Sequence, residues 1–191
     1  MDRNERQVRS AHSSFTTRED GKDLHLEGYF AVFNSNYEIF EGLTESVDRH
    51  AFDNTLDGDI RALTDHDTRL VLGRTTAGTL KLRTDDHGLY GDITINPNDG
   101  DAMNLYARVQ RGDVDQCSFG FFIRKEESEV FPNGDVHWTI KDVELYEVSV
   151  CTFPAYEETN VQARREDLAE IRRREREAWR LRMTEKLKKG Q

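Results

Sequence analysis

Residues 117–122 (CSFGFF) constrain the fold most, because they place a serine inside an aromatic run that is typical of a strand crossing a core. Side chains alternate faces along a strand, so Ser118 is expected to share a face with Gly120 and Phe122. Gly120 has no side chain and leaves room beside the serine oxygen for another backbone. Ser118 is therefore a candidate nucleophile, and the alternative is a serine that only hydrogen-bonds its neighbours.

The surrounding sequence predicts short strands with two helices. Strands are expected at residues 24–33, 37–44, 60–64, 78–83, 89–95 and 136–153. One helix is expected from Ser46 to about Gly58, and another over residues 102–109 with Gly112 as its stop. This order predicts an α+β fold, either a sandwich or a small β-barrel of mostly antiparallel strands with surrounding helices.

Charge and composition predict three zones. Residues 1–21 are polar without periodicity and are expected to be disordered, residues 22–160 form the body, and residues 161–191 form a basic helical tail. The tail has 11 Lys+Arg against 6 Asp+Glu, which leaves 16 against 31 for the rest. An acidic body argues against nucleic-acid binding. No apolar run approaches the roughly 20 residues of a membrane span, and two cysteines in separate strands predict reduced thiols in a cytoplasmic setting.

A serine nucleophile needs a general base, and His66 is the strongest of six histidines. It stands where an apolar strand breaks into the polar turn Asp65-His66-Asp67. A metal-dependent hydrolase that uses these three side chains is the competing hypothesis, although no second ligand pair supports it.

The imidazole in turn needs a group that orients it, and two carboxylates interrupt the apolar strand at residues 143–150. Alternation places Glu147 on the face of Leu145 and Cys151, and Glu144 on the opposite face. The residues alone leave both glutamates open as the orienting group.

Three motifs in the order His, Ser, acid carry a resemblance to a known family. They are Asp-His-Asp followed by VLGR (71–74), RGDVDQCSFGF (111–121), and LYEVSV (145–150) ending at PAY (154–156). From Gly28 to about Asn160, the chain resembles the prohead (procapsid) maturation proteases of tailed phages. The resemblance implies a fold like the herpesvirus assembly proteases. It also implies a serine endopeptidase in the procapsid interior, within the host cytoplasm, that cleaves scaffold and major capsid protein segments and itself.

Carried over by position, the resemblance makes Ser118 the nucleophile, His66 the base and Glu147 the third member. His137 is an alternative third member, because herpesvirus relatives use a histidine there. Gly120 and Phe119 are expected at the substrate, and Cys117 departs from the larger apolar residue that the family often has. The resemblance also implies a homo-oligomer without a cofactor, metal, membrane or nucleic-acid partner. A non-catalytic β-barrel capsid or tail component is the alternative function.

Overall fold

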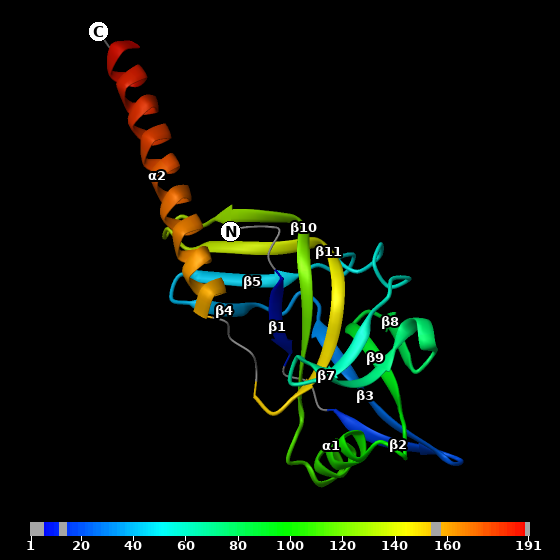
Figure 1. Ribbon diagram of the computed structural model, residues 1–191. Helices are drawn as coiled ribbons and strands as arrows, with labels where there is room; N and C mark the ends of the chain where they lie inside the picture. The colour runs from blue at the N-terminus through cyan, green and yellow to red at the C-terminus, as the bar shows by residue number, and fades with distance from the viewer. Residues whose placement is uncertain (1–5, 12–14, 154–157, 190–191) are drawn as a thin grey trace.

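The strands form two sheets in the part of the chain that this computed structural model describes, residues 6–11, 15–153 and 158–189 (Figure 1). The first sheet has the order β1 (Gln7–Ala11), β10 (Gln116–Val130), β11 (Val136–Cys151), β5 (Leu43–Val47) and β4 (Tyr37–Phe40). A hairpin of two more strands belongs to this sheet, because β11 also pairs with β6 (Arg61–Thr64), and β6 pairs with β7 (Asp67–Arg74). The second sheet has the order β2 (Thr16–Asp20), β3 (Asp23–Val32), β9 (Gly88–Ile95) and β8 (Leu80–Thr84). A 3₁₀ turn, Thr75–Ala77, follows β7, and the helices are α1 (Gly100–Arg111) and α2 (Glu158–Lys189).

The predicted α+β class and its mostly antiparallel pairing are confirmed, with β11 pairing in parallel to β5 and β6. In the described residues, however, the strands do not close into a barrel, since both sheets end in edge strands such as β1, β4, β2 and β8. A core of apolar side chains from both sheets and from α1 joins them, including Leu26, Phe30, Ile93, Phe119, Val148 and Leu105. The likeness to herpesvirus assembly proteases stays a prediction.

The segment 1–21, predicted as disordered, contains strands β1 and β2. Each is an edge strand that pairs through its backbone, β1 with β10 and β2 with β3. Val8 and Phe15 are buried beside them. Composition missed both strands because backbone pairing does not depend on an apolar sequence.

The helix predicted from Ser46 to Gly58 is also absent from the structure. Ser46 lies in β5, and the following residues form successive turns in which an N–H donates to the carbonyl three residues earlier, as Thr55 does to Phe52 and Gly58 to Thr55. Phe52 and Ala51 are fully buried all the same. The apolar spacing of this segment reflects core contacts and not helical geometry.

Helix α1 confirms the predicted stop at Gly112, begins at Gly100 instead of the predicted residue 102, and leads into β10. The Asp99 carboxylate accepts from the N–H groups of Asp101 (3.0 Å) and Ala102 (3.2 Å), and Gly112 ends the helix in the left-handed conformation. The helix packs into the core through its buried Leu105, among others, and the chain enters β10 four residues after Gly112. The position of Ser118 is thus tied to the body from this side.

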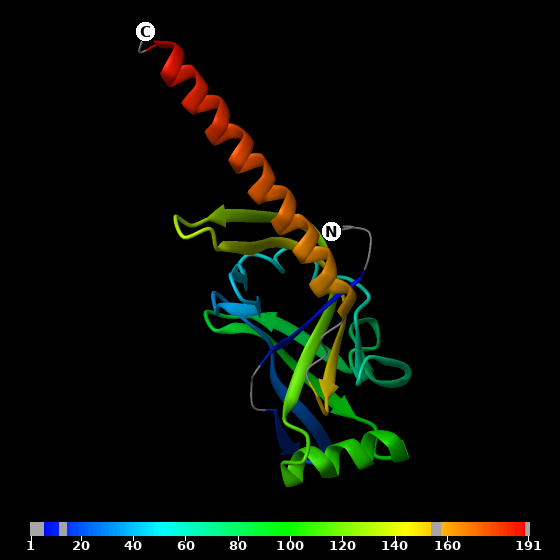
Figure 2. The same ribbon diagram turned by 90° about the vertical axis from the view of Figure 1, so that its left-hand side faces the viewer.

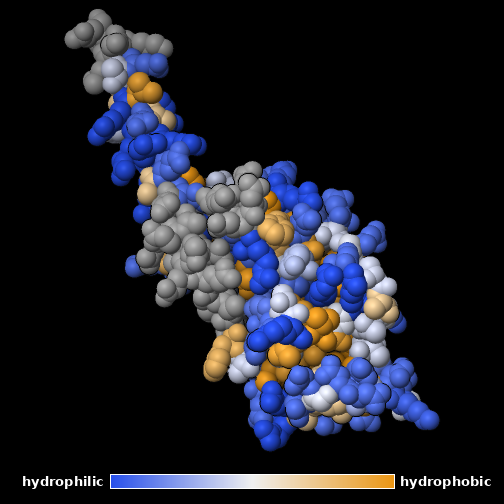
Figure 3. Space-filling view, in the orientation of Figure 1, coloured by the Kyte–Doolittle hydropathy of each residue, from blue (hydrophilic) through white to orange (hydrophobic). Residues whose placement is uncertain are grey.

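Helix α2 begins three residues before the predicted tail and projects away from the body as a long rod (Figures 1 and 2). Its first half docks, because Leu168 is buried beside Leu43, Val136 and Trp138. Farther along, Trp179 and Leu181 are exposed, and the visible face of the rod is mostly hydrophilic (Figure 3). Neither α1 nor α2, as described, is long and apolar enough to cross a bilayer.

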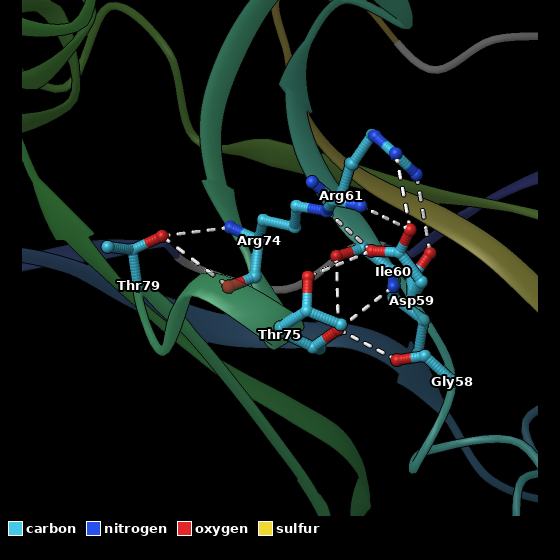
Figure 4. Close-up of polar contacts among 8 residues, drawn as sticks. Gly58, Asp59, Ile60, Arg61, Arg74, Thr75 and Thr79 are labelled. Carbon is cyan, nitrogen blue, oxygen red and sulfur yellow. Dashed lines mark hydrogen bonds and ion pairs between the residues drawn. The ribbon is translucent and has the colours of Figure 1, made fainter.

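A clamp of polar contacts closes the open end of the β6–β7 hairpin (Figure 4). Arg74 donates to both carboxylate oxygens of Asp59 at 2.6 Å, and Thr75 Oγ1 accepts from the Ile60 N–H (2.9 Å) and donates to the Gly58 carbonyl (2.7 Å). The bond to Arg74 lowers the pKa of Asp59 to about 2, although desolvation opposes this shift. The other end of this hairpin is the turn with His66.

Replacing Asp59 by asparagine should therefore lower the thermal midpoint at neutral pH, by an amount that depends on pH. A lowered folded-state pKa means that the carboxylate stabilises the fold fully above its ordinary value of 3.8 and loses this contribution as pH falls toward 2. We expect the thermal midpoints of the wild-type protein and Asp59→Asn, measured from pH 7 downward, to approach each other as the pH falls from about 4 toward 2. A constant difference down to the lowest pH measured would contradict the charged clamp.

Candidate active site

His66 lies in a tight turn with an unusual backbone. Asp65 and His66 have φ values of 47° and 60°, in the left-handed region that favours glycine, and they join β6 to β7 where Thr64 pairs with Asp67. The Asp65 carboxylate accepts from the Thr152 N–H (2.8 Å), which holds the turn against the end of β11. Backbone strain of this kind clusters at functional sites, where the surrounding structure maintains it.

The imidazole of His66 is oriented by a buried carboxylate. His66 Nδ1 lies 2.8 Å from Glu147 Oε1, and the other oxygen, Oε2, accepts from Ser149 Oγ at 2.7 Å. The backbone N–H of His66 donates to the same Ser149 Oγ (3.2 Å). Because Glu147 is fully buried, its charge is best met by a proton on Nδ1, and this tautomer leaves the Nε2 lone pair available as a base.

A register shift places Glu147 on this face. Gly120 pairs with Glu147 but Phe121 pairs with Leu145, so β11 has one extra residue at Tyr146. The shift points Leu145 into the core, and turns Glu147, Ser149 and Cys151 to the opposite side. The predicted sharing of one face by Glu147 and Leu145 is therefore wrong.

Gly120 makes room for the acid and not for a substrate strand. A Cβ at this position would overlap Glu147 Oε1 and would lie 3.0 Å from its Cδ. The predicted open space beside Ser118 thus holds the Glu147 carboxylate. Phe119 has its side chain in the core, stacked on Phe121 with the ring centroids 4.8 Å apart, and only its backbone reaches the neighbouring strand.

Ser118 is opposite Ser149 of β11 and opposite Ser10 of β1, so it shares its face with the His66–Glu147 pair. Opposed residues of an antiparallel pair have Cβ atoms about 5 Å apart, and Ser149 is itself bonded to His66. The Ser118 hydroxyl is fully buried and donates to the carbonyl of Arg9 (2.8 Å) instead of His66. The strands thus bring the three predicted residues to one face, with the serine bonded elsewhere.

The other sequence candidates lie apart from this pair. His137 is ten residues earlier on β11, with its ring nitrogens 2.8 Å from the hydroxyls of Thr44 and Ser46. Glu144 is exposed and paired with Arg124 (2.7 Å). Cys117 points to the other side of β10, where its thiol donates to the Tyr29 carbonyl (2.7 Å).

The residues of the competing metal hypothesis are bonded within the protein. Asp65 accepts from Thr152, and the half-buried Asp67 pairs with Arg69 at 2.7 Å. No group of three His, Cys, Asp or Glu side chains converges as a metal site within the described residues. The segment 154–156 of the third motif lies outside the described residues.

Sequence reasoning missed the neighbourhood of Cys151 and Ser149. Cys151 Sγ lies 3.8 Å from His66 Nε2, on the side of the ring that faces away from Glu147. Burial, with a smaller effect of the nearby Asp65 carboxylate, raises the pKa of this thiol, so it stays protonated at neutral pH. Alternation already placed Cys151 on the face of Glu147, and that was the signal available in the sequence.

Comparisons with known proteins agree with the family that the sequence resembles. The family profile of the caudovirus prohead serine proteases (Peptidase_S78) matches residues 13–174. The prohead protease of Enterobacteria phage HK97 is 32% identical over 148 residues, which is 75% of this chain and 61% of that protein, so the chain spans about three fifths of its length. The solved structure of the bacteriophage T4 capsid assembly protease, gp21, aligns with a TM-score of 0.48 and 12% identity, over 78% of this chain and 99% of the other.

Replacing Gly120 by alanine should break the bond between His66 and Glu147, because the new methyl group takes the place of the bonded carboxylate oxygen. We expect the downfield proton resonance of His66 Nδ1–H to disappear and the stability to fall by roughly 1–3 kcal/mol. Gly100→Ala is the matched control, since a Cβ there meets nothing within 4 Å. An unchanged His66 resonance in Gly120→Ala would contradict this account of the site.

Proposed function

The chain belongs to the caudovirus prohead serine protease family, and we propose that it is a serine endopeptidase that cleaves scaffold and major capsid protein segments during procapsid maturation. The observation that carries the proposal is the buried bond between His66 Nδ1 and Glu147. A carboxylate that fixes the imidazole tautomer is the orienting half of a catalytic triad. It lies on the same face as the serine that the family name requires.

In the proposed mechanism, Ser118 Oγ transfers its proton to His66 Nε2 while it attacks the carbonyl carbon of the substrate. The imidazolium, stabilised by Glu147, then gives this proton to the leaving amine as the peptide C–N bond breaks. A water molecule releases the acyl group by the same steps in reverse order. Before the first step, the Ser118 hydroxyl must give up its bond to the Arg9 carbonyl and direct its proton to His66.

We place this activity inside the procapsid, in the infected host cell, with the protein as a homo-oligomer and without a cofactor. The substrates are the scaffold and major capsid proteins of the same phage. The protease cuts both substrates in extended segments, because an extended chain can pair with a strand edge next to Ser118.

Ser118→Ala should abolish cleavage of the scaffold and the major capsid protein, while Cys117→Ala and Cys151→Ala should retain it. Removing a triad nucleophile costs on the order of 10³-fold or more in kcat, whereas both thiols are buried and that of Cys151 is protonated. Product formation followed by mass spectrometry, with fluorophosphonate labelling of the nucleophile, measures both effects. Equal cleavage by Ser118→Ala would end the serine protease proposal, and loss of cleavage in Cys151→Ala together with retained cleavage in Ser118→Ala would assign the nucleophile to the thiol.

We also propose that the enzyme removes part of its own tail, residues 161–191. The beginning of α2 is held by Leu168, but the exposed stretch around Trp179 and Leu181 has no core contact in the described structure. Local unfolding there would present an extended chain to another copy. Intact mass should show a shortened wild-type protein and a full-length Ser118→Ala protein, and identical intact masses would exclude self-processing.

A further inference from the structure

Strand β1 lies on the edge of β10 where a substrate of the proposed protease would bind. It pairs antiparallel with β10, with Ser10 opposite Ser118 and Arg9 opposite Phe119. The peptide carbonyl of Arg9, which belongs to the Arg9–Ser10 bond, accepts the hydrogen bond of the Ser118 hydroxyl (2.8 Å). An extended segment thus already lies at the proposed nucleophile, and its backbone pairs with β10 as the backbone of a bound substrate would.

The side chain of Arg9 occupies a specific acidic subsite. Its guanidinium bonds to both carboxylate oxygens of Glu45, from Nε to Oε1 and from Nη2 to Oε2 at 3.1 Å, and lies 5.8 Å from the centre of the Phe121 ring. Arg9 is 8% exposed and Glu45 2%. This fork geometry recognises a guanidinium more strongly than a neutral side chain of equal length.

The buried carboxylate of Glu45 needs a cation where the guanidinium of Arg9 lies. Glu45 also binds Arg164 of α2 (2.8 Å), and the same guanidinium binds Glu126 (2.8 Å). Burial alone would raise the pKa of Glu45, but the charges and bonds of Arg9 and Arg164 outweigh it and lower the pKa. Without Arg9, the buried carboxylate of Glu45 would lose one of the two arginines bonded to it, which is costly in a dry environment.

Space for a side chain adjoins this carboxylate. A cavity of about 260 Å³ is lined by Arg9 and Glu45 together with Tyr37, Ser46, Val47 and Phe119, among others. The preceding residue outside β1, Arg6, brings its Nη2 within 3.9 Å of Glu147 Oε1. The N-terminal segment therefore contacts the proposed acid through Arg6, and it contacts both the acidic subsite and the proposed nucleophile through Arg9.

We propose that Glu45 is the specificity residue of a subsite for arginine or lysine immediately before the cleaved bond, and that β1 occupies this subsite in the same chain. The inference rests on the proposed function, because it assigns a subsite to the proposed protease. β1 must leave the edge of β10 before a substrate enters. Its departure also frees the Ser118 hydroxyl from the Arg9 carbonyl, so that it can turn to His66.

The test uses the full-length protein and three peptides that carry the sequence of residues 6–11, RQVRSA, with arginine, norleucine or glutamate at the position of Arg9. The wild-type protein should cut the arginine peptide about 10-fold or more faster than the norleucine peptide, as kcat/KM, and the glutamate peptide least. Arg9→Ala should raise kcat/KM for the arginine peptide by about 10-fold or more, since an occupant in the same chain competes at high effective concentration.

Glu45→Gln should lose the preference for arginine over norleucine. The preference is a ratio within one protein sample, so a fall in the folded fraction does not change it. Glu126→Gln is the matched control, because it removes the other carboxylate bonded to Arg164 and should keep the preference.

Each outcome decides one proposal. If Ser118-dependent cleavage of capsid protein occurs but the peptides are uncut, or are cut without a preference for arginine, the subsite inference is wrong and the proposed function stands. An unchanged rate in Arg9→Ala shows that β1 is only a structural edge strand. If no substrate is cut in a Ser118-dependent manner, the proposed function itself fails.

Discussion

The fully buried carboxylate of Glu147 is the constraint on which the rest of the site depends. An isolated buried charge is strongly unfavourable, so each part of its surroundings has to supply a donor or space. His66 and Ser149 donate to its two oxygens, and Gly120 leaves the volume that it fills. The extra residue at Tyr146 and the left-handed turn at His66 are the two backbone irregularities that make this arrangement possible.

A second buried carboxylate joins strand β1 to helix α2. Glu45 binds Arg9 of the first strand and Arg164 of the last helix, so a single anion fixes both segments to the body. Arg164 is fully buried, with its guanidinium 5.0 Å from the centre of the Trp138 ring. In the proposed exchange of β1 for a substrate, an incoming cationic side chain would restore the ion pair that Glu45 loses with Arg9.

The sequence predicted elements well where local chemistry determines them. Helix α1 has its boundaries in Asp99 and Gly112, and the strands that became β3, β9, β10 and β11 have clear apolar patterns. Prediction failed where pairing with distant segments decides the structure. The turns at residues 48–58 have helical spacing without helical bonds, and the strands β1 and β2 have polar sequences that pair by backbone alone. No local pattern reveals the bulge at Tyr146, which reversed the face of Glu147.

The chemistry of the site was predictable to the same extent. Ser118 and His66 could be chosen because a nucleophile and a base have requirements that few residues of this chain meet, whereas the choice of Glu147 over Glu144 came from the family resemblance. What the sequence could not reveal is that the members of the proposed triad have different partners. His66 and Glu147 are bonded to each other, whereas the Ser118 hydroxyl donates to the Arg9 carbonyl of β1. In the proposed arrangement, β1 keeps the site inactive by holding the serine hydroxyl, while the bond between His66 and Glu147 stays intact.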